Sequence, residues 1–184
     1  MQATQPGALS DPAKSDVDDR LREFAHHLAK TQDAELMSTS KTDLLLERLE
    51  DWEKVLGNTK AIFKAVPSRD LPVSRAGEWM LDNFYIVKQT FRQVKEDLPA
   101  SFLNQLPKLK GMPMQGSPRI FALMWEWLGY SQSQLDLTQA AAFVQDYQQL
   151  KPLTIGELWA LPTMLRIGIL ERLVYAAAEL TGIE

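Results

Sequence analysis

The chain has no cysteine and only two histidines among its 184 residues. The lack of cysteine excludes disulfides, thiolate nucleophiles and cysteine-based zinc sites, and it is compatible with a reducing compartment. The histidines, His26 and His27, are adjacent, whereas a di-iron carboxylate bundle needs two separate Glu-x-x-His motifs. The single such spacing, from Glu23 to His26, therefore predicts a solvated helix face. We expect neither a metal nor another cofactor.

An excess of positive charge and a long uncharged apolar run are also missing. With 20 Lys and Arg against 24 Asp and Glu, the net charge is −4, which argues against a nucleic-acid partner. The most apolar window, residues 158–180, carries four charged side chains, so it does not predict a transmembrane span. Residues 1–15 lack the pattern of a signal peptide and predict a disordered tail. We expect a soluble chain.

Motifs for common catalytic chemistry are absent as well. The sequence contains no Walker A motif and no Gly-x-Gly-x-x-Gly loop that could cradle a phosphate. It also contains no nucleophile elbow for a serine hydrolase. Catalysis by one of these motifs is therefore not supported by the residues.

The apolar residues follow helical spacing, which predicts an all-α, single-domain bundle of about six helices over residues 16–184. Ser15 is expected to cap a helix over 15–30, and a second helix over 42–56 is expected to stop at Gly57 and Asn58, with a short angled piece over 59–66. Prolines should break the chain over 67–73. Ser74 is expected to open a helix that ends near Leu98.

The second half of the chain predicts three more helices. Residues 99–118 are rich in Pro and Gly and should be irregular, apart from a turn around Phe102. Pro118 suits the first position of a helix over 118–130, and Thr138 is expected to cap a helix that ends near Leu150. In the helix over 118–130, Trp125 and Trp127 lie about 200° apart, so only one of them should enter the core.

The last helix begins with the strongest local signal in the sequence. Thr154 and Glu157 have the spacing of a capping box, in which each side chain binds the backbone N–H of the other. Pro162 would be the eighth helical residue, so we expect a kink near 158–162. Arg166 follows one turn later and could meet a freed carbonyl or an acid on another helix.

Polar residues within otherwise apolar helix starts are the candidate site, because charges in such places are costly unless paired. We expect several of them to pair with each other in a buried network, and ligand binding is the less favoured reading. A carboxylate pair four residues apart, such as Glu78 with Asp82, could also raise a pKa for acid–base work, although a solvated edge is more common. The candidates are Glu78, Asp82, Asn83, Arg119, Glu157 and Arg166.

Several longer motifs resemble one known family. They are AGEWMLDNFYIVKQTFRQVKEDLP (76–99), LPKL (106–109), GSPR (116–119), LDL (135–137), FVQDYQQLKPLTIGELWALP (143–162) and MLR (164–166). In this order and near this spacing, they resemble the amino-terminal helical region of bacterial cyclic β-1,2-glucan synthases. The similarity covers about residues 76–175.

The resemblance implies that this chain is a non-catalytic part of a larger enzyme. These synthases are large multi-span inner-membrane proteins that build a β-1,2-glucan from UDP-glucose, and their sugar-nucleotide and metal-binding aspartates lie in a later domain with no counterpart here. The implied partner is the membrane glycosyltransferase domain, in cis or in trans, at the cytoplasmic face of the inner membrane. Family members continue beyond the last helix. The chain is therefore expected to be a fragment, the product of a split gene or a free-standing amino-terminal helical region.

Two other functions remain open from the residues. One is a free-standing helical adaptor unrelated to glucans. The other is a small carbohydrate-binding or carbohydrate-processing domain, in which Glu78 and Asp82 converge with Arg119 or Arg166 on one open cleft. The sequence leaves open whether the chain itself has enzyme activity.

Overall fold

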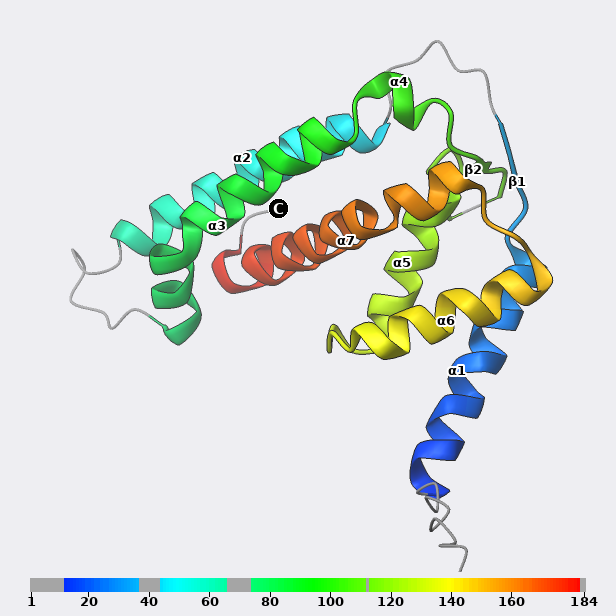
Figure 1. The fold of residues 1–184 in the computed structure, drawn as a ribbon. Helices are drawn as coiled ribbons and strands as arrows, with labels where there is room; N and C mark the ends of the chain where they lie inside the picture. The colour runs from blue at the N-terminus through cyan, green and yellow to red at the C-terminus, as the bar shows by residue number, and fades with distance from the viewer. Residues whose placement is uncertain (1–11, 37–43, 66–73, 112, 183–184) are drawn as a thin grey trace, which may run out of the picture. The chain divides into compact units, whose positions relative to one another are not determined.

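The computed structural model describes residues 12–36, 44–65, 74–111 and 113–182. These residues form seven helices and two strands of two residues each, so the all-α prediction is confirmed (Figure 1). The chain divides into two compact units. The smaller unit comprises residues 1–32 and 135–153, and the larger unit comprises residues 33–134 and 154–184. The single-domain boundary over 16–184 stays a prediction.

Helices α2 (Leu44–Ala65) and α3 (Arg75–Asp97) form an antiparallel pair in the larger unit (Figure 1). Each helix buries one side chain at every step of a 4-3-4-3-4 spacing, which places these side chains on one face. In α2 the buried residues are Leu45, Leu49, Trp52, Leu56, Thr59 and Phe63. In α3 and at its end they are Met80, Phe84, Val87, Phe91, Val94 and Leu98.

The predicted stop at Gly57 and Asn58 is wrong, because α2 continues through both residues to Ala65. A glycine inside a helix costs only about 1 kcal/mol relative to alanine. The buried spacing continues without a break across it, from Leu56 to Thr59 and Phe63, and this packing outweighs the local preference. The expected helix start at Thr42 and the expected break over 67–73 lie outside the described residues.

Helix α3 begins as predicted, since the Ser74 hydroxyl accepts a hydrogen bond from the N–H of Gly77 at 3.1 Å. Residues 98–111 and 113–118 are largely irregular, and α4 (Ala100–Leu103) is the turn expected around Phe102. Strand β2 (Lys108–Leu109) pairs antiparallel with β1 (Ala34–Glu35), in the register Ala34 to Leu109. This pairing fixes the segment before α5 (Arg119–Tyr130).

Helix α7 (Ile155–Thr181) packs on α5, on α2 and on α3 (Figure 1). Its contact with α5 depends on Gly168, because a Cβ atom there would lie 2.6 Å from the Leu128 side chain. The helix runs through Pro162 and ends at Gly182, whose φ of +66° suits glycine. The kink at Pro162 stays a prediction. Trp127 of α5 is fully buried and Trp125 only partly, as their angular separation predicts.

The smaller unit pairs α1 (Pro12–Thr31) with α6 (Leu137–Leu150). The Phe24 and Phe143 rings stack, with their centroids 5.8 Å apart. Helix α1 begins at Pro12, before the predicted cap at Ser15, because proline is tolerated in the first turn of a helix. Residues 12–15 are therefore helical, and the rest of the predicted tail, residues 1–11, lies outside the described residues.

Two helix starts in the second half differ from the predictions by one or two residues. Pro118 is the residue before α5 and not its first residue. The cap of α6 is Asp136 and not Thr138, because the Asp136 carboxylate accepts hydrogen bonds from the N–H groups of Thr138 at 2.8 Å and Gln139 at 3.2 Å. An ionised carboxylate also suits the positive end of the helix dipole better than a hydroxyl.

Candidate functional site

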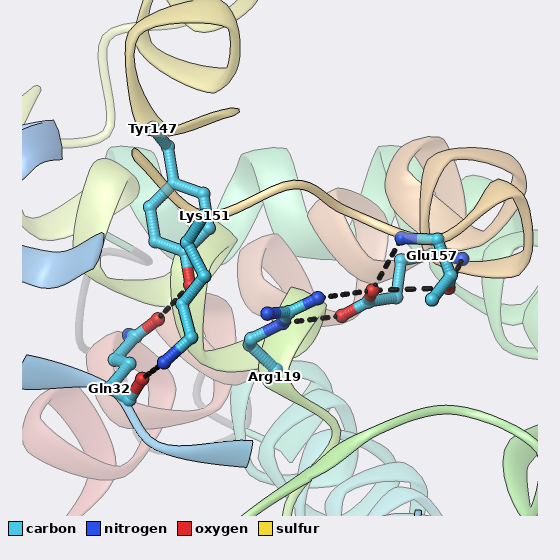
Figure 2. A network of polar contacts seen from close by, with 6 residues as sticks. Gln32, Arg119, Tyr147, Lys151 and Glu157 are labelled. Atoms are coloured by element: carbon cyan, nitrogen blue, oxygen red, sulfur yellow. Dashed lines mark hydrogen bonds and ion pairs between the residues drawn. The ribbon is translucent and has the colours of Figure 1, made fainter. Parts of the chain in front are cut away.

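The first turns of α5 and α7 meet at a buried ion pair between Arg119 and Glu157 (Figure 2). Arg119 is the first residue of α5, and its N–H is bound to the carbonyl of Pro107 at 2.8 Å. Glu157 lies in the first turn of α7, after the cap at Thr154. A positive charge at a helix N-terminus opposes the helix dipole, so Arg119 needs an acidic partner there.

The Arg119 guanidinium binds the Glu157 carboxylate through two parallel hydrogen bonds. Its Nε donates to Oε1 at 2.7 Å, and its Nη2 donates to Oε2 at 2.6 Å. The exposed fraction of the side chain is 6% for Arg119 and 0% for Glu157. Bidentate, charge-assisted pairs of this kind are among the strongest polar contacts in proteins.

The same carboxylate completes the capping box of α7. Oε2 of Glu157 accepts from the backbone N–H of Thr154 at 2.8 Å and from the Thr154 hydroxyl at 3.1 Å. In return, the Thr154 hydroxyl accepts from the N–H of Glu157 at 3.2 Å. Both carboxylate oxygens thus have charged or backbone donors, and none of the side chain reaches solvent. The contact between Arg119, Glu157 and Thr154 holds the first turns of α5 and α7 together, and we call it the α5–α7 joint. It leaves the carboxylate no access to a substrate.

The other four predicted site residues are not part of this joint. Arg166 pairs instead with Asp97 at the end of α3, at 3.5 Å, and both side chains are 39% exposed. Asn83 donates to the carbonyl of Trp79 one turn earlier, at 2.9 Å. Glu78 and Asp82 are exposed on α3. A carbohydrate-processing cleft that uses Arg119 is hard to reconcile with its burial, and the functional roles of all six residues stay predictions.

A second buried acid, Glu171 of α7, was not predicted from the sequence, and its side chain is 2% exposed. Its Oε1 atom forms an ion pair with Arg48 of α2 and accepts from the Tyr175 hydroxyl at 3.4 Å. Its Oε2 atom has no hydrogen-bond partner within the described part of the chain. A signal for its burial was present, because Glu171 continues the spacing of apolar residues at 160, 164 and 167.

Burial raises the pKa of the Glu171 carboxyl above its ordinary value. The positive charge of Arg48 and the Tyr175 hydroxyl lower that pKa and offset the burial only in part. Next to this carboxyl, the guanidinium of Arg172 lies 4.9 Å from the centroid of the Trp125 ring. Burial also raises the pKa of Glu126 on α5, against the opposing effect of Arg172.

The smaller unit has its own polar contacts, at the C-terminal ends of α1 and α6 (Figure 2). The Tyr147 hydroxyl donates to Oε1 of Gln32 at 3.2 Å, and the Lys151 ammonium donates to the carbonyl of Gln32. These bonds tie the end of α6 to the end of α1. Because they satisfy a buried tyrosine and the backbone carbonyl that follows α1, they serve the packing of the two helices.

A shallow polar groove of about 440 Å³ lies along α1 and α6 in the smaller unit. It is lined by acidic and amide side chains, among them Asp18, Asp136, Gln139 and Asp146. Arg22 lies 3.7 Å from Asp146 and partly neutralises this surface, and Asp136 is engaged as the cap of α6. The groove has no aromatic lining residue on which a sugar ring could stack. Within the described ranges, no cluster of three or more acidic or histidine side chains could hold a metal ion.

Of the helices in the described residues, none combines the length and apolar character that crossing a membrane requires.

No protein-family profile matches the chain. A stretch of 103 residues, 55% of this chain, is 37% identical to part of the cyclic beta-(1,2)-glucan synthase NdvB of Rhizobium meliloti (strain 1021). The chain spans only 4% of the length of that relative. The resemblance inferred from the motifs is therefore confirmed, and the chain contains a region related to one segment of a cyclic β-(1,2)-glucan synthase.

Proposed function

We propose that this chain is a non-catalytic helical region that packs against, or regulates, a UDP-glucose-dependent membrane glycosyltransferase that makes β-1,2-glucan. The partner acts in cis or in trans at the cytoplasmic face of the inner membrane. The observation that carries the proposal is the identity of 37% over 103 residues with one segment of a glucan synthase.

The chemistry of the described residues supports a structural role. The buried acid of the α5–α7 joint, Glu157, is saturated with donors and has no exposed surface. The carboxylates of Glu78 and Asp82 on α3 are exposed. A region of this kind contributes by its shape and its packing, because its buried charges, Arg119 and Glu157, already hold two helices together.

A direct test of the non-catalytic role uses the purified chain and radiolabelled UDP-glucose. We expect no labelled glucan, with or without Mg²⁺, while membranes that contain a complete glucan synthase produce it in the same assay. Formation of labelled β-1,2-glucan by the purified chain alone would refute the non-catalytic role.

A second test addresses the packing or regulatory role in the R. meliloti relative. Deleting its matching segment should reduce glucan synthesis in membrane vesicles, and replacing that segment with the matching residues of this chain should restore it. The matched control is the same replacement carrying Arg119→Ala, which breaks the α5–α7 joint and should restore less. If the deletion leaves both the rate and the products of glucan synthesis unchanged, the proposed role is wrong.

A further inference from the structure

The turn that follows α5 has an unusual backbone conformation. Gln132 and Ser133 have φ angles of +51° and +60°. Within the ranges that the structure describes, they are the only residues other than glycine with a positive φ, and they are consecutive. Residues with a side chain disfavour this left-handed region, because the Cβ atom crowds the following carbonyl oxygen. Glycine, asparagine and aspartate tolerate it best, and neither residue of this turn is one of these.

Side-chain packing does not hold this turn in place. Gln132 and Ser133 are exposed, and so are Gln134, Leu135 and Asp136 after them. Strained backbone persists only where its surroundings enforce it. The conformation of the turn must therefore be enforced by its backbone hydrogen bonds or by the helices on either side of it.

Two backbone hydrogen bonds close the turn onto the end of α5. The N–H of Ser133 donates to the carbonyl of Leu128 at 2.9 Å. The N–H of Gln132 donates to the carbonyl of Gly129 at 3.2 Å. This is the hydrogen-bond pattern of a Schellman motif, which usually has glycine at the position that Gln132 occupies here. The bonds are those of a common helix end, but the residues do not suit its φ angles.

A longer α5 would satisfy the same N–H groups without the positive φ angles. In an α-helix, the N–H groups of residues 132–134 would bind the carbonyls of residues 128–130. The observed turn also satisfies all three, since the N–H of Gln134 donates to the carbonyl of Ser131 at 2.9 Å. The number of hydrogen bonds is therefore equal in the two arrangements, whereas the φ angles favour the longer helix.

The start of α6 opposes this extension. Asp136 caps α6 by accepting hydrogen bonds from the N–H groups of Thr138 and Gln139. A helix extended through Gln134 would leave only Leu135 before the capping residue, whereas about two to eight residues usually connect two helices. Extension of α5 should therefore break the cap of α6. The strain of the turn and the cap of α6 act against each other.

From this opposition we propose that residues 131–134 are a two-state switch at the end of α5. In the observed state the turn is strained and Asp136 caps α6. In the other state α5 is one turn longer, Gln132 and Ser133 have helical φ angles, and the cap of α6 is lost. The switch lies where the chain passes from the larger unit to the smaller one. This inference stands on the turn alone and does not depend on the proposed function.

Native-state hydrogen exchange of the full chain, followed by NMR at the N–H groups of residues 132–134, tests the switch. Glycine adopts left-handed φ angles without strain, so Gln132→Gly and Ser133→Gly should each raise the protection factors there about fivefold. The matched control is Ser131→Gly in the same turn, where φ is −75° and glycine relieves no strain. It should leave the protection factors unchanged or lower them. Equal effects of the three substitutions would overturn the proposal.

The helical character of the second state separates it from a turn that merely opens. Gln132→Val should favour the second state, because a β-branched residue is especially unfavourable at a positive φ. We expect the Cα chemical shifts of residues 132–134 to move toward helical values. The N–H groups of Thr138 and Gln139 should lose protection at the same time, as the cap of α6 is released. Movement of these Cα shifts toward random-coil values would overturn the proposal.

Removal of the α6 cap tests the coupling from the other side. Asp136→Ala should also move the Cα shifts of residues 132–134 toward helical values, because the opposition to a longer α5 is gone. The matched control, Ser74→Ala, removes the cap of α3 and should leave those shifts unchanged. Circular dichroism should show both variants folded, since both side chains are exposed. Unchanged shifts in Asp136→Ala would show that the turn and the cap are independent, and would overturn the proposal.

Discussion

The two buried acids of α7, Glu157 and Glu171, lie about four turns apart on one helix and have different surroundings. Glu157 has a bidentate arginine on one side and the capping threonine on the other. Glu171 shares one oxygen between Arg48 and Tyr175, while its other oxygen lacks a partner in the described residues. Both side chains are excluded from water. The difference between them lies in the protein hydrogen-bond donors that replace water around each carboxylate.

This difference teaches that burial alone does not make an acid a stabilising residue. A carboxylate taken out of water loses several kcal/mol of solvation, and only well-placed donors restore it. At Glu157 four hydrogen-bond donors, two from Arg119 and two from Thr154, replace the lost solvation. At Glu171 the pKa is raised by burial, which shows that the ionised form is disfavoured despite the nearby arginine. We therefore expect the α5–α7 joint to stabilise the larger unit in a way that Glu171 does not.

Arg119→Ala should have the largest effect, because it leaves the Glu157 carboxylate buried without its arginine. Removing one member of a buried pair costs about 3–5 kcal/mol. We expect this loss in the free energy of unfolding, measured by urea denaturation at pH 7. Arg48→Ala is the matched control at the other acid, and it should cost less because Arg48 is 38% exposed. Equal losses for the two variants would contradict the comparison.

Glu157→Gln tests the same joint from the acidic side. The amide keeps the size of the side chain, but it offers Arg119 only one acceptor atom and no negative charge. We expect a loss of about 3 kcal/mol in urea denaturation. Thr154→Ala, which removes only the cap, should cost about 1 kcal/mol. If the glutamine variant is as stable as the unchanged chain, the joint is not held by its charges.

Unlike Glu157→Gln, Glu171→Gln should not lower the free energy of unfolding at pH 7. Its effect on that free energy should depend on pH. Because the folded-state pKa is raised, the protonated carboxyl favours folding, and this contribution is complete below the ordinary value of 4.5. It is lost as the pH rises from there through the raised folded-state pKa. The glutamine variant lacks this loss, so its stability relative to the unchanged chain should increase between pH 4 and pH 7.

Unfolding by urea at several pH values measures that difference. At pH 7 the variant should be at least as stable as the unchanged chain, in contrast to Glu157→Gln. A variant that loses stability relative to the unchanged chain as the pH rises would show that the ionised Glu171 stabilises the fold.

Arg166→Ala should have the smallest effect of the four. Its pair with Asp97 joins α7 to α3 at 3.5 Å, but both side chains are 39% exposed, so water and salt screen the attraction. Such pairs contribute about 0–1 kcal/mol. We expect a change in this range by thermal unfolding in dilute buffer. A loss approaching that of Arg119→Ala would mean that the Asp97 contact is as important as the joint.

Several elements of the fold were predictable because their signals are local. Ser74 and the capping box of Thr154 and Glu157 specify helix starts through contacts within four residues, and both helices begin where they were expected to begin. The continuous stripe from Met80 to Leu98 likewise determined which face of α3 is buried. The similarity to a glucan synthase was also readable from the motifs alone.

Other features depended on contacts between distant residues. The stop at Gly57 failed because α2 packs against α3 and α7, and this packing offsets the cost of a glycine in the helix. Glu171 was missed because its partner Arg48 lies 123 residues away, and no local motif announces such a pair. The pairing of Arg119 with Glu157 also depended on a contact between distant residues, which lie 38 positions apart in the sequence.

By itself the sequence determined that the chain is helical, where several helices begin, and which family segment it resembles. The helices and their starts follow from hydrogen bonds and side-chain spacing within a few turns, which the order of residues specifies directly, and the resemblance follows from the identity of the residues. Only the tertiary structure decided that Glu157 is matched by a full set of donors and Glu171 is not. The cost of burying a charge depends on which atoms surround it, and those atoms come from helices that meet only in the folded chain.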